Sequence, residues 1–328
     1  MRYQQAGKQM PWRVGLDEAG YGPNLGPLVV CSTAIRVTDP TATIWKLFPE
    51  SMRQAGGKKD QRLIVDDSKK VYSGGQGLEQ LETGVLALLA CSTGAIPGDL
   101  ASLLQATTSA DCRADLQQEF WFTEDVALPK WAPLTAIDQA RGAVLAEAPT
   151  DTVFGPMQAM IVPTGRFNQL LKEWQVKSGI VQHALIQLLA ATNDLQPKNE
   201  DIFIAIDRLG GRLYYTAFLS EAFPGCWVQT VKETAGESVY EIIGHDRTIT
   251  VRFAPRSDAD HWNVALSSML AKYLRELLMV QFNEFWQREL PNLQPTAGYP
   301  VDALRFMKEI SSIQEKKGIT REALWREK

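Results

Sequence analysis

Residues 13–37 carry the sequence RVGLDEAGYGPNLGPLVVCSTAIRV, and this stretch decides the fold. Its first five residues are strand-like, a turn rich in Gly and Pro continues to Pro27, and residues 28–37 are apolar and β-branched. Two strands joined by such a turn predict a β-hairpin. Residues 201–207, DIFIAID, predict a further buried strand that ends in a carboxylate.

Two helical patterns accompany these strands. Residues 180–191 have helical periodicity, and the apolar positions of residues 264–290 follow the three-and-four spacing of an amphipathic helix. Together with the strands they predict an α/β fold. Residues 92–165 have a different sequence pattern, because prolines and tryptophans are frequent there and strands and helices do not clearly alternate. A helix is indicated near residues 111–119. We expect an inserted segment in that range.

Composition excludes several classes of protein. The chain has 328 residues, of which 45% are hydrophobic and 22% charged, as in a globular protein with a sizeable core. It has no apolar run long enough to span a bilayer and no apolar stretch near its start, so we expect a cytoplasmic protein without membrane contact. A net charge of −4 gives no global positive field, so any binding of nucleic acid must use a local patch.

Adjacent carboxylates follow the first predicted strand. Successive strand side chains point to opposite faces, so Asp17 and Glu18 can share one metal site only if the backbone bends, which Gly20 and Gly22 permit. A dinucleotide-binding loop is an alternative interpretation of the Gly-x-Gly spacing. It is disfavoured because a strand follows instead of a helix, and because two carboxylates would repel a phosphate unless a cation intervened.

Asp207, at the end of a predicted strand, and Asp258, ahead of the long helix, could complete such a site. Oxygen ligands from separate elements suit Mg²⁺ or Mn²⁺, and four carboxylates can hold a pair of ions bridged by a phosphate. A two-metal site of this kind is typical of phosphodiester hydrolysis, and it requires no histidine. The alternative is that these residues are solvated surface carboxylates, as most Asp and Glu residues are.

Five ordered blocks of the sequence resemble the type 2 ribonuclease H family, which comprises ribonucleases HII and HIII. The blocks are Gly15–Gly22, similar to G-x-D-E-[AS]-G-x-G; Asp67–Lys70, similar to D-S-K-K; Ile204–Asp207 with Gly210 and Tyr214; Ser257–Asp258 with Ala265–Lys272; and Gly298–Pro300 with Asp302 and Phe306. Residues 92–165 remain unmatched. A spacing of fourteen residues before Lys272 favours Asp258 over Asp260 as the fourth carboxylate.

The resemblance implies a ribonuclease H-like fold, with a central mixed β-sheet flanked by helices. The core would comprise residues 1–91 and 166–290, with an insertion at 92–165 and a substrate-contacting C-terminal extension at 291–328. It also implies an endonuclease that uses two Mg²⁺ or Mn²⁺ ions to cut the RNA strand of RNA/DNA hybrids, or to cut at ribonucleotides embedded in duplex DNA. We expect the protein to be a monomer, although the sequence does not reveal the oligomeric state. The implied catalytic residues and metal ligands are Asp17, Glu18, Asp207 and Asp258, and the implied substrate-binding residues are Gly20, Tyr21, Gly22, Lys69, Ser268 and Tyr299.

The chain departs from the family pattern at informative positions. Tyr21 stands where ribonuclease HII has an arginine that helps to recognise the RNA-to-DNA junction, so the preferred substrate stays open. His261 is either a proton shuttle or, more typically for a histidine near a helix start, a cap or surface residue. Two alternative functions also remain: a metal-dependent nuclease of the same fold acting on another structured nucleic acid, and a non-catalytic nucleic-acid-binding module.

Overall fold

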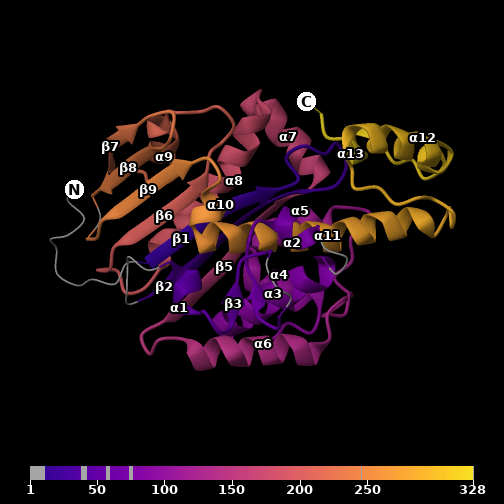
Figure 1. Cartoon of the computed structure of the whole chain (residues 1–328). Coiled ribbons are helices and arrows are strands. Elements are labelled where there is room, and N and C mark those ends of the chain that lie inside the picture. The colour runs from indigo at the N-terminus through magenta and orange to yellow at the C-terminus, as the bar shows by residue number, and fades with distance from the viewer. Residues whose placement is uncertain (1–11, 38–42, 57–59, 74–76, 245, 328) are drawn as a thin grey trace.

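The computed structural model describes residues 12–37, 43–56, 60–73, 77–244 and 246–327. Within these ranges seven strands form one central sheet, flanked by helices on both faces (Figure 1). In spatial order the strands are β5 (Val153–Val162), β2 (Leu28–Arg36), β1 (Trp12–Ala19), β6 (Ile202–Asp207), β9 (Ile249–Ala254), β8 (Ser238–Ile243) and β7 (Trp227–Glu233).

The sheet is mixed, and its parallel part lies at the centre. β1, β6 and β9 run parallel to one another, whereas β2, β5, β8 and β7 add antiparallel neighbours on either side. The predicted hairpin is confirmed, because β1 and β2 pair from Trp12 opposite Arg36 to Ala19 opposite Val29. The predicted strand at 201–207 is confirmed as β6. The α/β class with a mixed sheet is therefore confirmed.

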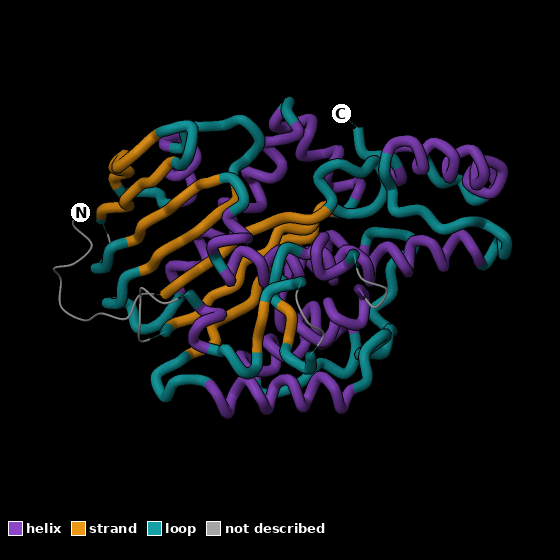
Figure 2. The backbone as a smooth tube through the Cα atoms, viewed as in Figure 1, coloured by secondary structure: helices purple, strands orange, loops and turns teal. Residues whose placement is uncertain are grey.

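Helices cover both faces of this sheet (Figure 2). One core lies between the sheet and two long helices, and the other lies against three shorter ones. β2 shows the division, since Val29 and Ile35 face the first core while Leu28 and Val30 face the second. The first core uses α3 (Gly77–Thr93) and α11 (Trp262–Gln287); the second uses α7 (Thr164–Trp174), α8 (Lys177–Ala191) and α9 (Thr216–Ala222).

The long helix α11 lies directly on β1, and Gly15 makes this approach possible. A Cβ atom on Gly15 would fall 2.2 Å from the backbone nitrogen of Val264. Polar side chains then fix the contact: the Ser267 hydroxyl donates to the Gly15 carbonyl at 2.8 Å, and the Thr33 hydroxyl donates to the Asn263 carbonyl at 2.8 Å. α11 is thereby held beside the residues that follow Gly15 in β1.

Residues 92–165 contain three helices and one strand of the central sheet. The helices are α4 (Leu100–Thr107), α5 (Ala110–Gln117) and α6 (Leu134–Glu147), and α5 confirms the helix expected near residues 111–119. The strand is β5, which the sequence pattern did not indicate because Gly155 and Pro156 interrupt it. β5 is the last strand on its side of the sheet, where a proline is tolerated. The division of the chain into core, insertion and extension stays a prediction.

Glu82 ties residues 92–165 to the rest of the protein. Its carboxylate is fully buried in α3, and it accepts hydrogen bonds from the backbone N–H groups of Lys130, Trp131 and Ala132 at 2.7, 2.5 and 2.6 Å. The Tyr273 hydroxyl of α11 donates a fourth, at 2.9 Å. A buried carboxylate with four donors is well satisfied. It joins α3, α11 and the segment ahead of α6.

Short elements complete the described chain. They are α1 (Ile44–Leu47), β3 (Met52–Arg53), β4 (Leu63–Ile64), α2 (Ser68–Tyr72), the 3₁₀ helix η1 (Thr192–Asp194), α10 (Ser257–Asp260), α12 (Pro300–Lys316) and α13 (Arg321–Leu324). In the described residues no helix combines the length and the apolar character that crossing a bilayer requires.

Candidate active site

Three of the predicted carboxylates lie near the C-terminal ends of neighbouring parallel strands, at the same edge of the sheet. Leu16 of β1 pairs with Ile206 of β6, so Asp17 and Asp207 are the next residues along two adjacent strands. Asp258 lies in α10, which follows β9, the parallel neighbour of β6. Because parallel strands end at a common edge, the fold brings together residues that are far apart in the sequence.

Ser257 fixes α10 to the strand ends. Its hydroxyl donates to the carbonyl of Ala254 at 2.9 Å and lies 3.1 Å from the carbonyl of Ile206, while its N–H donates to Oδ1 of Asp207 at 3.3 Å. The side chain is fully buried. These contacts set the position of Asp258, the next residue, relative to Asp207.

The carboxylates influence one another electrostatically. Burial raises the pKa of Asp17 well above its ordinary value, and the charges of Glu18 and Asp207 raise it further. Burial and then the Asp207 charge raise the pKa of Glu18. The pKa of Asp258 is raised by burial, with Asp67 and Asp207 adding to the effect. Like charges at close range disfavour ionisation, so a cation bound among these groups would stabilise their charged forms.

Ser268 connects Asp17 with α2. Its hydroxyl is hydrogen-bonded to the Asp17 carboxyl group and lies 3.0 Å from the hydroxyl of Ser68, the first residue of α2. Both serines are buried. The predicted substrate-binding residue Ser268 is thus in the second turn of α11, in contact with a candidate metal ligand.

The two lysines of α2 have different surroundings. The Lys69 ammonium group is close enough to Glu18 to lower the pKa of that carboxyl group. Lys70 instead forms an ion pair with the buried Asp66, at 2.9 Å between Nζ and Oδ1. The charge of Lys70 also lowers the pKa of Asp258, so both lysines lie near candidate ligands: Lys69, which the sequence favoured, near Glu18, and Lys70 near Asp258. Asp67, beside Asp258, belongs to this neighbourhood although the sequence analysis did not include it among the candidate ligands.

The glycine loop after β1 lies against Tyr299. Gly20 has a φ of +89°, which side-chain-bearing residues rarely adopt. A Cβ atom on Gly22 would stand 3.6 Å from Cε1 of Tyr299, so the two residues are neighbours. The Tyr299 side chain is 54% exposed at the start of α12. Its ring is available to a ligand that lies over the loop.

A cation lies beside this loop, at the ring of Tyr21. The Nζ atom of Lys177, at the start of α8, lies 5.0 Å from the centroid of the Tyr21 ring. This distance is within the range of a cation–π contact. The sequence analysis missed Lys177 because no local pattern connects the start of α8 with the loop after β1.

The residues next to Asp258 have other roles. Asp260 is exposed. His261 is packed against Phe203 and its Nε2 atom accepts a hydrogen bond from Arg252 at 2.9 Å. Burial, together with the Arg252 charge, lowers the pKa of His261 to about 4. The ring is therefore uncharged at neutral pH, and Arg252 occupies the nitrogen that a proton shuttle would use.

The donor set suits a hard cation that is completed by substrate and water. In the part of the chain that the structure describes, no three His, Cys, Asp or Glu side chains already stand as ligands of one ion. Mg²⁺ typically takes only one or two carboxylates and fills its remaining positions with water and substrate phosphate. Asp17, Glu18, Asp207 and Asp258 offer only oxygen ligands, and their mutual repulsion fits that use.

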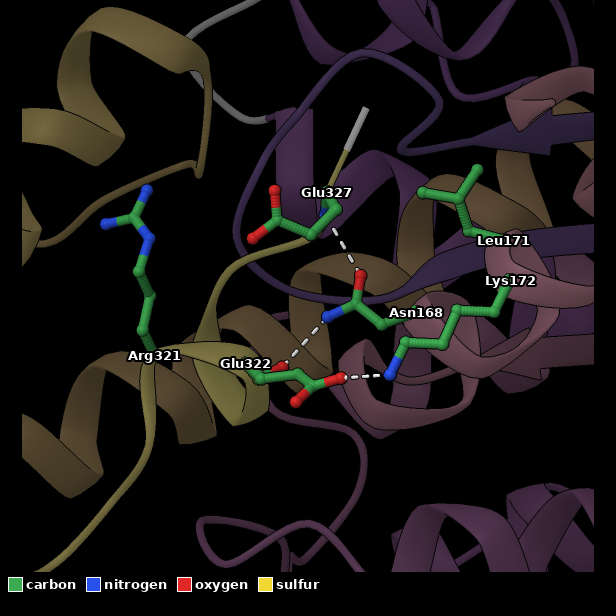
Figure 3. A pocket seen from close by; sticks show the side chains of 6 residues that line it. All are labelled: Asn168, Leu171, Lys172, Arg321, Glu322 and Glu327. Atoms are coloured by element: carbon green, nitrogen blue, oxygen red, sulfur yellow. Dashed lines mark hydrogen bonds and ion pairs between the residues drawn. The ribbon is translucent and has the colours of Figure 1, made fainter. Parts of the chain in front are cut away.

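A pocket of about 410 Å³ lies elsewhere on the molecule (Figure 3). None of the four carboxylates is among the residues that line it, which are Asn168, Leu171, Lys172, Arg321, Glu322 and Glu327. The charged lining includes an ion pair of 2.6 Å between Lys172 and Glu322. The candidate active site is therefore defined by the carboxylates and not by this pocket.

Fold and site together define an α/β protein that carries acidic side chains where three neighbouring parallel strands end. No family model and no curated protein matches the chain. Solved structures do match over most of its length. A chain from the PCNA–RNase HII complex of Archaeoglobus fulgidus matches 95% of this chain and 92% of its own, with a TM-score of 0.40 and 12% identity.

Two further matches have similar statistics. Ribonuclease H2 from Pyrococcus horikoshii matches 95% of this chain and 92% of its own, with a TM-score of 0.41 and 13% identity. Bst-RNase HIII in complex with Mn²⁺ matches 98% of this chain and 67% of its own, with a TM-score of 0.40 and 14% identity. At such low similarity, an assignment of chemistry to this chain has to rest on its own residues.

Proposed function

We propose that this protein is a divalent-metal-dependent endonuclease that hydrolyses the RNA strand of RNA/DNA hybrids, or cuts duplex DNA at embedded ribonucleotides. The observation that carries the proposal is the meeting of Asp17, Glu18 and Asp207 at one sheet edge, where burial and neighbouring carboxylates raise the pKa of Asp17 and of Glu18. Such an arrangement stabilises a protein only when a cation is present, which favours a catalytic role over a non-catalytic binding module.

Each residue of the candidate site has a defined task in this proposal. Asp17, Glu18, Asp207 and Asp258 would hold Mg²⁺ or Mn²⁺, and the bound metal would supply activation of a water molecule and stabilisation of the leaving oxygen. Lys69 adds positive charge next to Glu18, where a phosphate of the substrate would arrive.

The loop and Tyr299 would recognise the substrate. The 2′-hydroxyl distinguishes RNA from DNA, so recognition of a single ribonucleotide requires close approach of the protein backbone. Gly20 and Gly22 permit that approach, and the exposed ring of Tyr299 beside Gly22 offers a face for stacking on the adjacent nucleotide. Tyr21 and Lys177 flank the same position. The preference of the enzyme for RNA/DNA hybrids or for embedded ribonucleotides would depend on the glycine loop, Tyr299, Tyr21 and Lys177.

A cleavage panel tests the proposal. Labelled duplexes with a single ribonucleotide, full RNA/DNA hybrids, double-stranded RNA and branched DNA would each be incubated with Mg²⁺, Mn²⁺ or a chelator. We expect metal-dependent cutting of one or both of the first two substrates. Cutting of double-stranded RNA or branched DNA alone would instead support the alternative of a nuclease with another substrate, and no metal-dependent cutting of any substrate would refute the proposal.

Two variants of the same strand provide a matched comparison. Asp207 ends β6 at the candidate site, whereas Asp201 precedes β6 at the opposite end, where it accepts a hydrogen bond from the Thr248 N–H. We expect Asp207→Asn to lower the cleavage rate by roughly 10³-fold or more, as for the loss of a principal charged group in an active site. Asp201→Asn should keep the rate within about twofold. Equal rates in the two variants would exclude Asp207 from the reaction.

A further inference from the structure

Arg326, in the segment after α13, is bound to the loop of residues 20–25. Its Nη2 atom donates to the Gly20 carbonyl at 2.7 Å and also to the Pro23 carbonyl. The backbone of Arg326 is bound to Asn24 as well: the Arg326 N–H donates to the Asn24 carbonyl at 2.8 Å, and the side-chain Nδ2 of Asn24 donates to the Arg326 carbonyl at 3.1 Å. Arg326 is 1% exposed, so these contacts are buried beneath the loop.

A second buried arginine links the same loop to the segment that precedes Tyr299. Arg275 of α11 is 2% exposed, and its Nη2 atom donates to the Ala297 carbonyl at 2.9 Å and, more weakly, to the Leu25 carbonyl at 3.4 Å. The Gly298 carbonyl accepts hydrogen bonds from the N–H groups of residues 24 and 25, at 2.7 and 3.2 Å. Three segments that are distant in sequence therefore meet around two guanidinium groups.

The segment that carries Arg326 is itself anchored on α7. Asn168 donates to the carbonyl of Glu322 at 2.9 Å, and its Oδ1 atom accepts from the Glu327 N–H at 2.9 Å (Figure 3). It also donates to the carbonyl of Trp325 at 2.9 Å. The Arg326 guanidinium also lies 4.6 Å from the centroid of the Phe167 ring, on the same helix. α7 thus provides a fixed support from which Arg326 reaches the loop.

Stability alone does not account for this pair of arginines. Within the described residues Nε of Arg275 and both Nε and Nη1 of Arg326 lack a hydrogen-bond partner. Burial, and then the charge of Arg275, lowers the pKa of Arg326 to about 9. Burial also lowers the pKa of Arg275, and the Glu276 carboxylate, 3.8 Å from the Nη1 atom of Arg275, offsets this only in part. Burying such charges is costly, and apolar residues of similar volume are often at least as stabilising.

We propose that Arg326 and Arg275 are positioning residues, which draw the carbonyl groups of the loop inward and hold Gly20 and Gly22 at a fixed place beside the carboxylates and Tyr299. The purpose of that placement rests on the proposed nuclease function. The placement of the loop is independent of that function, because the hydrogen bonds from the two arginines define it. The ligand that the held loop receives is the sugar–phosphate backbone of the substrate.

The test compares Arg326→Met, Arg326→Lys and a control, Arg321→Gln. Methionine keeps much of the side-chain length without its donors, and lysine restores a cation that can reach one carbonyl. Arg321 is an exposed cation of the preceding helix α13, and its guanidinium lies over the Trp325 ring. Amide hydrogen exchange at Asn24 and Leu25 would be measured by NMR, together with the melting temperature and with kcat and KM for the cleaved duplex.

We expect exchange at Asn24 and Leu25 to be at least tenfold faster in Arg326→Met, with a melting temperature within a few degrees of the wild type. We expect kcat to fall roughly 10- to 100-fold with a smaller change in KM, because small misplacements of a contact near the reaction slow it strongly. Arg326→Lys should recover part of both effects. Arg321→Gln should change neither.

The results test two claims separately: the positioning role of Arg326 and the proposed nuclease function. Unchanged exchange and unchanged kcat in Arg326→Met overturn the positioning role, as does an equal effect of Arg321→Gln. Amide exchange could be faster in Arg326→Met while the wild-type protein cuts no substrate. That pair of results would support the positioning of the loop by Arg326 and refute the nuclease proposal. The exchange measurement needs no activity, so the two failures are distinguishable.

Discussion

Asp17 and Glu82 are both carboxyl groups that hydrogen-bond to a side chain of α11, yet their surroundings are opposite. Glu82 meets only donors, namely three backbone N–H groups and the Tyr273 hydroxyl. Asp17 receives a hydrogen bond from Ser268 but also faces the carboxylates of Glu18 and Asp207. The first environment stabilises a negative charge, whereas the second opposes it.

The difference separates acidic residues whose charge the protein itself satisfies from acidic residues whose charge calls for a bound cation. A carboxylate that the protein itself satisfies needs no ligand, and its removal leaves buried donors without an acceptor. A group of carboxylates that repel one another costs folding free energy and is useful only with a cation. Opposite responses to substitution should therefore separate the two sites.

The largest effect is expected for Glu82→Leu. The substitution leaves three backbone N–H groups and the Tyr273 hydroxyl without their acceptor, so the free energy of unfolding should fall by about 4 kcal/mol or more. Urea denaturation measures this value. Asp138→Ala on α6, whose side chain is 70% exposed, is the control and should change it by less than about 0.5 kcal/mol. A change in the free energy of unfolding no larger than that of Asp138→Ala would mean that Glu82 does not stabilise the fold, and the contrast with Asp17 would fail.

Glu119 offers an intermediate case with a defined pH dependence. Its buried carboxyl group accepts from Trp121 Nε1 at 2.8 Å, and burial raises its pKa from 4.5 to about 7. The folded state therefore holds the proton more tightly than the unfolded state. This contribution to stability is complete below pH 4.5 and is lost as the pH rises to about 7, a difference of about 3 kcal/mol.

Glu119→Gln should remove this pH dependence. Urea unfolding at pH 5 and pH 8 would give a smaller difference between the two pH values in the variant than in the wild type. Effects of other titrating groups cancel in that comparison, since both proteins contain them. Parallel pH profiles of the two proteins would mean that Glu119 is as well satisfied as Glu82 and ionises normally.

Asp17→Asn should change stability in the direction opposite to Glu82→Leu. The amide keeps a hydrogen-bonding partner for Ser268 and removes the repulsion by Glu18 and Asp207, so the metal-free protein should gain about 1 kcal/mol. Because the pKa of Asp17 is raised in the folded state, this gain should be larger at neutral pH than at pH 4. A loss of stability at neutral pH in thermal and urea unfolding would show that the two carboxyl groups are equivalent.

The smallest effect concerns divalent ions. Mg²⁺ or Mn²⁺ at three times its dissociation constant should stabilise the wild type by about 0.8 kcal/mol. The stabilisation should be weaker in Asp17→Asn, intact in the control Asp201→Asn, and reversed by chelator in thermal unfolding. An ion effect of the same size in Asp17→Asn would place the binding site away from the sheet edge.

Much of the candidate site could be predicted from the sequence because its residues are tied to strand ends. Alternation and turn residues indicate the hairpin of β1 and β2, and apolar runs ending in Asp mark the ends of β1 and β6. The edge strand β5 escaped prediction because Gly155 and Pro156 break its pattern, and only pairing with β2 stabilises it as a strand.

The roles of Glu82 and Arg326 could not be predicted from strand and turn patterns. Glu82 binds backbone N–H groups, which are chemically alike in nearly every residue and so leave no signature at residues 130–132. Arg326 lies 306 positions from Gly20, and Lys177 reaches Tyr21 only through the packing of α7 and α8. Such contacts depend on how helices dock, which local patterns do not encode.

The distance in sequence between the loop and Arg326 has a consequence for biosynthesis. Ribosomes add roughly 5–20 residues per second. The 306 positions that separate Gly20 from Arg326 therefore correspond to about 15–60 s of translation. Throughout that interval a nascent chain already carries Asp17 and Glu18 but not the arginine that fixes the loop beside them. A polypeptide that is released before residue 326 lacks this arginine, so its loop of residues 20–25 would not receive the hydrogen bonds that Arg326 donates to the carbonyls of Gly20 and Pro23.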